Sequence, residues 1–364
     1  MRVLVTGGAG FIGSAVVDQL IEAGHHVRVL DNLSPAAHSS APDYLNPDAE
    51  YLWADLTDPD AVSRALVGID TVSHQAARVG LGVDFDDVGA YVNDNDAGTA
   101  VLLGCLYRMR WQGRFALASS MVVYGEGTYV CVEHGPVRPG PRRAKDLEEG
   151  RFEPTCPECT AELTPADLDE QTPLGPRNVY AATKVHQEHL CEAFARETAS
   201  ALCCLRYHNV YGPRMPRDTP YAGVASIFRS AFASGRAPEV FEDGGQRRDF
   251  IHVSDVARAN VAALEAAHSV GGPFNIASGE VHTIGEMADA LQAGFGEGAY
   301  DPVITGRYRI GDVRHVTASP NRAQRLLGFK ARINFARGML EFATAPLRGG
   351  LTHASSSSNH TTGA

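Results

Sequence analysis

The sequence predicts an α/β protein with a doubly wound parallel sheet and a smaller α/β lobe towards its C-terminus. Two observations predict the sheet: short apolar runs alternate with amphipathic stretches, and a glycine-rich turn follows the first apolar run. A third predicts the lobe, because Pro213, Pro216 and Pro220 interrupt this alternation. The chain has 364 residues, which is enough for both parts.

Periodicity and capping signals define the individual elements. Apolar residues recur at helical spacing over residues 14–24, and Gly24 is placed to end that helix. Asp58 followed by Pro59 starts a second helix in the usual order of cap and first turn. The predicted strands are residues 2–8, 26–31, 51–56, 71–77, 115–120 and 201–206. In the lobe we predict a helix near 222–235, strands at 238–244 and 247–253, and a helix opened by a capping box at 283–286.

Composition excludes several classes of function. The chain carries 32 Lys and Arg against 43 Asp and Glu, a formal charge of −11. Without a basic cluster, a nucleic-acid partner is not expected. No apolar run approaches the ~18 residues that a membrane span requires. We therefore expect a cytoplasmic protein whose seven cysteines remain reduced.

The glycine-rich turn is the first candidate binding element. "TGGAGFIG" supplies Gly7, Gly10 and Gly13 between a predicted strand and a predicted helix. Glycines let the backbone turn sharply and approach a pyrophosphate, while the helix N-terminus offers free N–H groups. A tight turn without a ligand is the alternative, but the flanking strand and helix favour dinucleotide binding in a Rossmann-type fold.

Two strand ends supply candidate contacts to the rest of a dinucleotide. Asp31 closes the second strand, 18 residues after Gly13. A carboxylate there accepts hydrogen bonds from ribose hydroxyls and repels a 2′-phosphate, which favours NAD over NADP. Asp55 and Leu56, after the third strand, are candidate adenine-side contacts; an ordinary strand end is the alternative.

A candidate proton-transfer centre lies further along the chain. "NVYAATK" places Tyr180 and Lys184 four residues apart on one face of a predicted helix. Lowering a tyrosine pKa from ~10 to near 7 requires about 4 kcal/mol, which an ammonium and a positive nicotinamide ring could supply together. Ser120, at a strand end, is placed to hydrogen-bond the substrate oxygen, with Ser119 as its nearest rival. A surface Tyr–Lys pair is the alternative.

Together these motifs resemble the extended short-chain dehydrogenase/reductase family of nucleotide-sugar epimerases and dehydratases. The resemblance rests on "TGGAGFIG", "SSMVVYG", Tyr180-x3-Lys184, "RYHNVYGP" and "RRDFIHVSDVA", in the order of that family over about residues 1–345. It implies catalytic Ser120, Tyr180 and Lys184, a nucleotide diphosphate sugar substrate, and a homodimer. His208 stands where the family usually has an aromatic residue.

The resemblance also assigns binding residues and domain limits. Asn95 matches a cofactor-side asparagine, and Asn209, Arg248 and Arg309 match positions that hold the diphosphate or nucleoside. The expected NAD-binding residues are Gly7, Gly10, Phe11, Ile12, Gly13, Asp31, Asn32, Asp55, Leu56, Ala76, Asn95, Tyr180 and Lys184. We place the NAD-binding domain at 1–211 with 251–278 returning to it, the substrate lobe at 212–250 and 279–345, and a disordered tail at 349–364.

The same residues indicate a reaction. Dehydratases of this family carry an Asp–Glu pair after the catalytic hydroxyl, whereas this chain has Met121 and Val122. Stretches 220–228, 240–253 and 304–315 are similar to dTDP-L-rhamnose 4-epimerases. The sequence therefore predicts an NAD-dependent nucleotide-sugar 4-epimerase. A UDP-hexose 4-epimerase, a ketosugar reductase and a non-catalytic NAD-binding sensor remain alternatives.

An insert at residues 127–172 separates Ser120 from Tyr180. Within it, Cys131-x2-His134 and Cys156-x2-Cys159 form two pairs of soft or borderline ligands. This pattern suits a closed tetrahedral structural zinc, which would order a loop rich in Pro, Gly and charge. Four unconnected residues in a loop are the alternative. Four protein ligands leave no open position, so we expect no catalytic metal.

Overall fold

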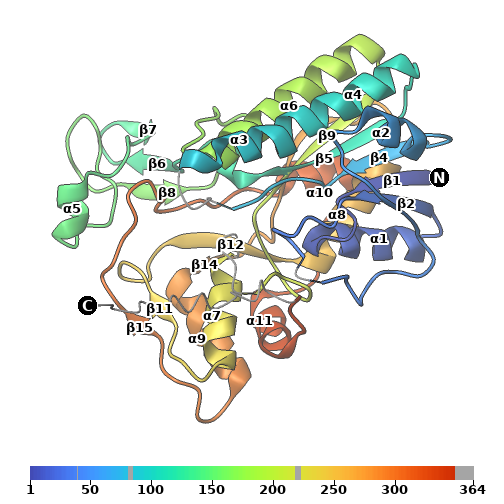
Figure 1. Ribbon diagram of the computed structural model, residues 1–364. Helices are drawn as coiled ribbons and strands as arrows, with labels where there is room; N and C mark the ends of the chain where they lie inside the picture. The colour runs from blue at the N-terminus through green and yellow to red at the C-terminus, as the bar shows by residue number, and fades with distance from the viewer. Residues whose placement is uncertain (39, 81–84, 218–222, 349–364) are drawn as a thin grey trace, which may run out of the picture.

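The computed structural model describes residues 1–38, 40–80, 85–217 and 223–348. Its centre is a seven-stranded sheet whose neighbouring strands all run parallel (Figure 1). Across the sheet, the strands are β13 (Gly272–Ile276), β9 (Ala201–Tyr207), β5 (Arg114–Ser120), β4 (Thr71–His74), β1 (Arg2–Thr6), β2 (His26–Asp31) and β3 (Glu50–Trp53). The order reverses after β1, so the doubly wound topology is confirmed.

Helices cover both faces of this sheet. On one face lie α1 (Phe11–Glu22), α8 (Val253–Glu265) and α10 (Asn321–Leu327); on the other lie α2 (Pro59–Ala65), α4 (Gly98–Arg108) and α6 (Val179–Thr198). Asp58 caps α2 as predicted, since its carboxylate accepts the N–H groups of Asp60 and Ala61. Shorter helical segments are η1 (Phe85–Asp87), α3 (Val88–Tyr91), η2 (Val92–Ala97) and η3 (Met121–Tyr124).

A second, smaller core lies beneath the carboxyl edge of the sheet (Figure 1). Its elements are β10 (Asn209–Tyr211), β12 (Arg247–His252), β14 (Val281–Thr283), β11 (Glu239–Val240), β15 (Val303–Ile304), α7 (Val224–Ala233), α9 (Ile284–Phe295) and α11 (Phe335–Thr344). The predicted capping box is present, because Thr283 and Glu286 hydrogen-bond each other's backbone at the start of α9. The chain leaves this core through α8 and β13 to complete the large sheet.

One assigned boundary differs from the structure. The predicted substrate lobe at 279–345 includes residues 321–329, but Ala323 and Phe329 are buried in the core of the large sheet with α8. The reason is geometric: β13 is an edge strand, and α10 packs on β13 and α8 beside it. The tail at 349–364 lies outside the described residues.

The insert forms a small unit at the left of Figure 1. It consists of β6 (Thr128–Cys131), β7 (Gly135–Val137) and β8 (Thr164–Ala166) in an antiparallel sheet of order β7-β6-β8, with α5 (Ala144–Glu148). Its buried apolar cluster is small and includes two of the cysteines. That cluster comprises Tyr129, Cys131, Cys156 and Leu163, with Val137 and Cys159 packed against it. Burial of so few side chains supplies little folding energy.

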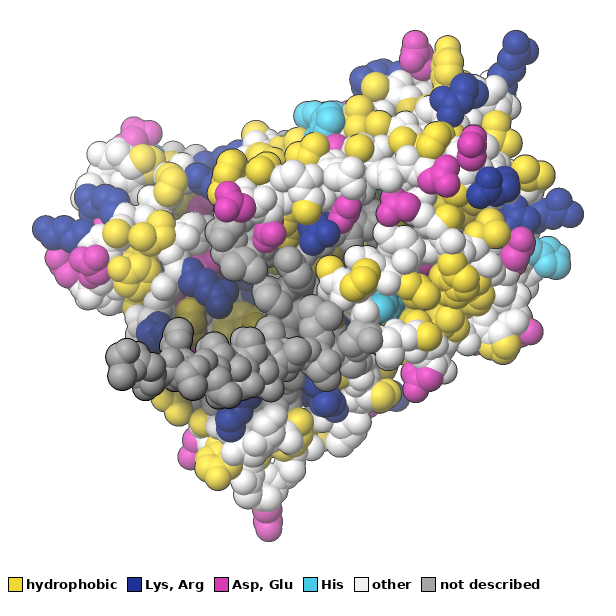
Figure 2. Space-filling view, in the orientation of Figure 1, with side chains coloured by type: hydrophobic (Ala, Val, Ile, Leu, Met, Phe, Trp, Pro, Cys, Tyr) yellow, Lys and Arg dark blue, Asp and Glu magenta, His cyan; other side chains and the backbone are white. Residues whose placement is uncertain are grey.

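Two surface properties bear on partners. Within the described ranges, no helix combines the length and apolarity needed to cross a membrane. On the face shown in Figure 2, basic and acidic side chains are interspersed rather than gathered into a continuous basic field.

Candidate active site

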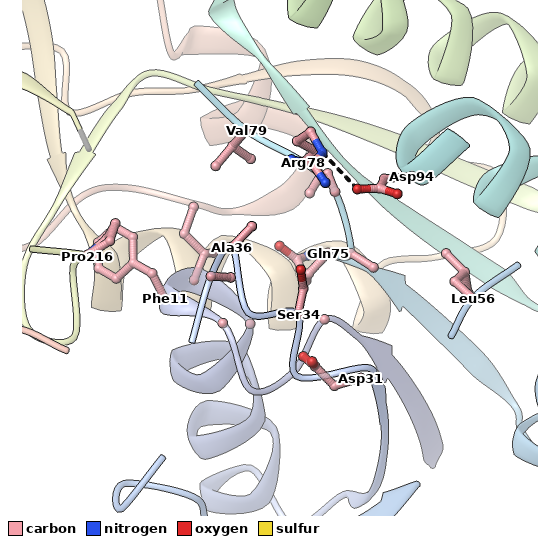
Figure 3. A pocket seen from close by; sticks show the side chains of 18 of the residues that line it. Phe11, Asp31, Ser34, Ala36, Leu56, Gln75, Arg78, Val79, Asp94 and Pro216 are labelled. Atoms are coloured by element: carbon pink, nitrogen blue, oxygen red, sulfur yellow. Dashed lines mark hydrogen bonds and ion pairs between the residues drawn. The ribbon is translucent and has the colours of Figure 1, made fainter. Parts of the chain in front are cut away.

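A cavity of about 380 Å³ opens at the carboxyl ends of the central strands, where the strand order reverses. In such sheets this crevice is the usual place for a ligand. Figure 3 shows its walls: Phe11 and Asp31 line it together with Gln75 and Val79 from the loop after β4. The cavity extends from the glycine-rich turn to Ser120, Tyr180 and Lys184.

Two of the three glycines are required by close packing. Gly7 has φ of +68°, and a Cβ there would lie 2.7 Å from the backbone of Ala76. A Cβ on Gly13 would lie 2.1 Å from the carbonyl oxygen of Gly7. No other residue type fits either position without moving the backbone. The turn therefore presents bare backbone to the cavity at the N-terminus of α1, which suits a pyrophosphate.

The side chain of Asp31 is held at the cavity by the backbone. Its carboxylate accepts hydrogen bonds from the N–H of Ala9 at 3.0 Å and of Leu33 at 2.8 Å. Carboxylate oxygens have further lone pairs, so the group can also accept from ribose hydroxyls. Nearby, Asn32 donates to Asp55 at 2.8 Å, which ties the second and third strand ends together. Both residues and Leu56 line the cavity.

Tyr180 and Lys184 lie on the first turns of α6, which Asn178 caps by accepting the N–H of Ala181 at 2.8 Å. Burial raises the pKa of Tyr180 to about 12, and a hydrogen bond with the Ser120 side chain opposes that rise. Burial also lowers the pKa of Lys184 to about 8. The Lys184 ammonium lies 5.9 Å from the Tyr180 ring centroid and donates to the carbonyl of Ala118 at 2.9 Å.

Hydrogen bonding distinguishes the two serines at the end of β5. Ser119 donates its hydroxyl to Glu188, a buried carboxylate that also pairs with Arg206 at 2.7 Å. Ser120 instead lies beside the Tyr180 hydroxyl and lines the cavity. Ser120 is therefore the serine that stands beside the candidate base.

Most expected cofactor residues line the cavity, but Asn95 does not. Its fully buried amide accepts the N–H of Arg78 at 2.7 Å and donates to Thr183 on α6 at 2.9 Å. Asn95 thus braces the cavity wall from behind. Arg78, which it holds, lines the cavity and pairs with Asp94 at 2.8 Å (Figure 3).

Of the four expected substrate residues, Ser120 lines this cavity, whereas the three expected at the diphosphate or nucleoside lie outside its lining. Asn209 on β10 has a buried side-chain oxygen without a hydrogen-bond partner among the described residues. Arg248, on the neighbouring strand β12, donates to the carbonyl oxygens of Val313 and Arg314, each at 2.8 Å. Arg309 is exposed, with its guanidinium 5.1 Å from the Phe241 ring centroid. Because a buried acceptor is normally hydrogen-bonded, the side-chain oxygen of Asn209 is a candidate contact for a ligand.

The cavity also contains residues that sequence reasoning missed. Arg348 comes from the end of the described chain, and its Nε and Nη1 are buried without partners in the described structure. Its Nη1 lies 4.0 Å from the point where a Cβ on Gly10 would be, next to the pyrophosphate cradle. Arg348 belongs to none of the sequence motifs, so the sequence did not predict it. His208 also lines the cavity, and burial lowers its pKa to about 3, so it is neutral.

The four candidate metal ligands meet in the insert. Their ligand atoms all lie within 4.8 Å of one another. The Cys131 sulfur is 3.5 Å from His134 Nδ1 and 3.6 Å from the Cys159 sulfur, and the Cys156 sulfur is 3.6 Å from His134 Nδ1. These distances exclude a disulfide, whose sulfurs are ~2.05 Å apart. The residues form a Cys3His cluster able to hold a metal ion.

A family model described as "NAD dependent epimerase/dehydratase family" matches residues 3–277, which include the cavity-lining strand ends. The chain belongs to this family. The epimerase/dehydratase family accounts for a glycine-rich cradle, an Asp at the second strand end and a Tyr–Lys pair in one cavity. NAD is the cofactor that the family uses.

Individual relatives of this epimerase/dehydratase chain are similar over nearly its full length. A dTDP-L-rhamnose 4-epimerase of Burkholderia thailandensis is 34% identical, covering 94% of both chains. Among solved structures, a UDP-glucose 4-epimerase from Thermotoga maritima with UDP-glucose aligns with a TM-score of 0.76 at 30% identity, covering 94% of this chain and 97% of that one. A Thermus thermophilus UDP-glucose 4-epimerase complexed with NAD gives 0.74 at 28%, covering 94% and 98%.

Proposed function

We propose that this protein is an NAD-dependent nucleotide-sugar 4-epimerase that acts on a dTDP-6-deoxyhexose such as dTDP-L-rhamnose. The observation that carries the proposal is a single cavity joining the glycine cradle, with Asp31, to Ser120 and the buried Tyr180–Lys184 pair. A dinucleotide extended along that cavity would place its nicotinamide end beside Tyr180. NAD, when bound, supplies the acceptor and donor of the hydride.

The chain's own residues perform the proton steps of the proposed reaction. Tyr180 removes the proton of the C4 hydroxyl. It returns the proton to the same oxygen after the keto-sugar has rotated in the site and presented its other face. Ser120 hydrogen-bonds that oxygen and holds it at the tyrosine. Lys184 stabilises the phenolate by its charge. One proton and one hydride leave the sugar and both return, so no second substrate is consumed.

Dehydration is disfavoured by the groups that follow Ser120. Elimination of water requires an acid for the departing hydroxyl and a base for the proton next to the ketone. Met121 and Val122 occupy the first positions of η3 and can do neither. The carboxylates among the residues that line the cavity are Asp31, Asp55 and Asp94. Asp31 and Asp55 belong to the adenosine end, and Asp94 pairs with Arg78.

The choice of sugar rests on similarity to the Burkholderia thailandensis dTDP-L-rhamnose 4-epimerase, at 34% identity. The test is product analysis by NMR with catalytic NAD⁺ and, separately, dTDP-L-rhamnose, UDP-glucose and UDP-N-acetylglucosamine. We expect C4 inversion of the first sugar without net NADH. Inversion of a UDP-sugar alone would show that the proposed substrate is wrong. Stoichiometric nicotinamide consumption would show that the protein is a reductase and not an epimerase. No product with NAD bound would favour a sensor.

We also propose a structural zinc ion in the insert, held by Cys131, His134, Cys156 and Cys159. A tetrahedral zinc with Zn–S of ~2.3 Å and Zn–N of ~2.1 Å separates two sulfurs by about 3.8 Å and a sulfur from a nitrogen by about 3.6 Å. Three of the six separations, at 3.5, 3.6 and 3.6 Å, agree with this geometry, and all four ligand atoms lie within 4.8 Å of one another. Elemental analysis should find one zinc per chain, and Cys156→Ser should lose it; zinc-free purified protein would refute the site.

A further inference from the structure

The insert is joined to the substrate lobe by buried charges. Arg142, whose side chain is 5% exposed, donates to both carboxylate oxygens of Glu242 at 3.0 and 2.8 Å. The same guanidinium donates to the carbonyl of Asp312 at 2.9 Å. Bidentate pairs of this kind fix orientation as well as distance.

A second contact uses Glu153, three residues before the ligand Cys156. Its carboxylate accepts from Arg314 at 2.6 Å and from His315 at 2.8 Å. The Arg314 side chain is 2% exposed and also pairs with Asp243 and Glu242. Because these charges are out of water, losing one partner leaves the others uncompensated.

A third contact comes from the strand that carries Cys131. Tyr129, fully buried beside that cysteine, donates to Glu126 at 3.1 Å, and Glu126 accepts the backbone N–H of Arg314 at 3.1 Å. In Figure 1 the orange segment after β15 runs beside β8 of the insert, where Leu168 pairs with Ala318. We call Glu126, Arg142, Glu153 and their partners in residues 312–315 the insert latch.

Residues 312–315, which the insert latch holds on one side, contact Arg248 on the other. The guanidinium of Arg248 donates to the carbonyl oxygens of Val313 and Arg314, and the N–H of Val316 donates to Arg247 at 3.1 Å. The segment is therefore held between the insert and β12. In contrast, no residue between Ser120 and Tyr180 is among those that line the cofactor cavity.

We propose that the metal-ordered insert fixes Arg248 through the insert latch, so that the metal sets affinity for the nucleotide diphosphate end of the substrate and leaves NAD binding unchanged. The metal joins the turn at Cys131–His134 to the turn at Cys156–Cys159, which positions Glu126 and Glu153 on the same segment. Arg142, Glu153 and Glu126 are positioning residues here, because they act through residues 312–315. The inference rests on the proposed function, on the role in holding the diphosphate that the family resemblance implies for Arg248, and on the proposed zinc.

The experiment compares metal-stripped protein and Glu153→Gln with the wild type. Glu153→Gln breaks the latch but keeps all four ligands. Glu149→Gln is the matched control, since Glu149 is an exposed acid of the same insert that pairs with Arg151. For each, dTDP binding is measured by calorimetry, together with zinc content, NAD content, and hydrogen exchange at residues 312–318.

We expect stripped protein and Glu153→Gln to bind dTDP about tenfold more weakly, with KM raised more than kcat is lowered and NAD content unchanged. Exchange at 312–318 should rise in both, while Glu149→Gln matches the wild type. Unchanged dTDP affinity and exchange in Glu153→Gln would overturn the latch even if stripped protein unfolds. If wild-type protein binds no dTDP, the proposed function is wrong. Hydrogen exchange at residues 312–318 in Glu153→Gln then still tests whether the insert latch orders that segment.

Discussion

Tyr180 and Lys184 share a buried position on α6, and burial moves their pKa values in opposite directions, to about 12 and about 8. Both shifts disfavour the charged form. Lowering the pKa of Tyr180 from about 12 to near 7 requires about 7 kcal/mol of preferential stabilisation of the phenolate. This is more than a tyrosine of ordinary pKa would need. We expect Lys184, 5.9 Å from the ring centroid, and the positive nicotinamide ring of bound NAD⁺ to supply this stabilisation together.

Tyr180→Phe removes the candidate base and keeps the ring in its buried site. We expect kcat to fall by about 10³-fold or more, because general-base catalysis contributes on the order of 10²–10⁴ and no other group replaces it. NAD content should stay at the wild-type level. Steady-state kinetics with cofactor analysis checks this, and wild-type rates in the variant would show that Tyr180 is not the base.

The pKa of Lys184 predicts an alkaline limit to activity. Above about pH 8 the ammonium loses its proton, the phenolate loses that stabilisation, and kcat/KM should decline. Lys184→Arg keeps a positive charge at these pH values, so its slower reaction should show no decline up to pH 10. A decline near pH 8 that persists in Lys184→Arg would assign it to another group.

Arg348 predicts a cofactor contact outside any motif. Its buried Nη1 lies beside Gly10, has no hydrogen-bond partner among the described residues, and suits a phosphate oxygen. Arg348→Gln should raise the Kd for NAD about tenfold, equivalent to about 1.4 kcal/mol. Arg337→Gln, which alters an exposed pair on α11, is the control and should bind NAD normally. Equal affinity in both variants would place Arg348 outside the cofactor site.

At the scale of elements, the N-terminus of α6 orients the catalytic pair. Asn178 caps this helix two residues before Tyr180, whereas Thr283 caps α9 in the lobe. Asn178→Ala and Thr283→Ala should each lower the free energy of unfolding by about 1 kcal/mol. Only Asn178→Ala should lower kcat, because only that helix carries Tyr180 and Lys184.

Denaturant unfolding and steady-state kinetics on the same preparations check this pair. If Asn178→Ala lost stability but kept its kcat, the cap would serve the fold and not the orientation of the base. If both variants lost activity equally, general destabilisation would account for the effect.

In the molecule as a whole, the sequence predicted the features that depend on neighbouring residues in the chain. Periodicity located six of the seven strands of the central sheet, and the glycine spacing identified the turn in which Gly7 packs against Ala76. Contacts between distant segments were not predictable. Arg348 reaches the cavity only because the chain returns from the lobe, and Asn95 turned out to face α6. Likewise, the clamping of residues 312–315 by the insert follows from tertiary packing and leaves no local pattern.

In the proposed reaction, hydride leaves C4 of the sugar and returns to the same carbon inside one cavity. The most direct measurement uses dTDP-L-rhamnose carrying deuterium at C4, with catalytic unlabelled NAD⁺, and locates the label in the product by NMR. We predict a C4-inverted sugar that keeps its deuterium at C4. Loss of the label to solvent, or its accumulation in free reduced nicotinamide, would contradict the epimerase.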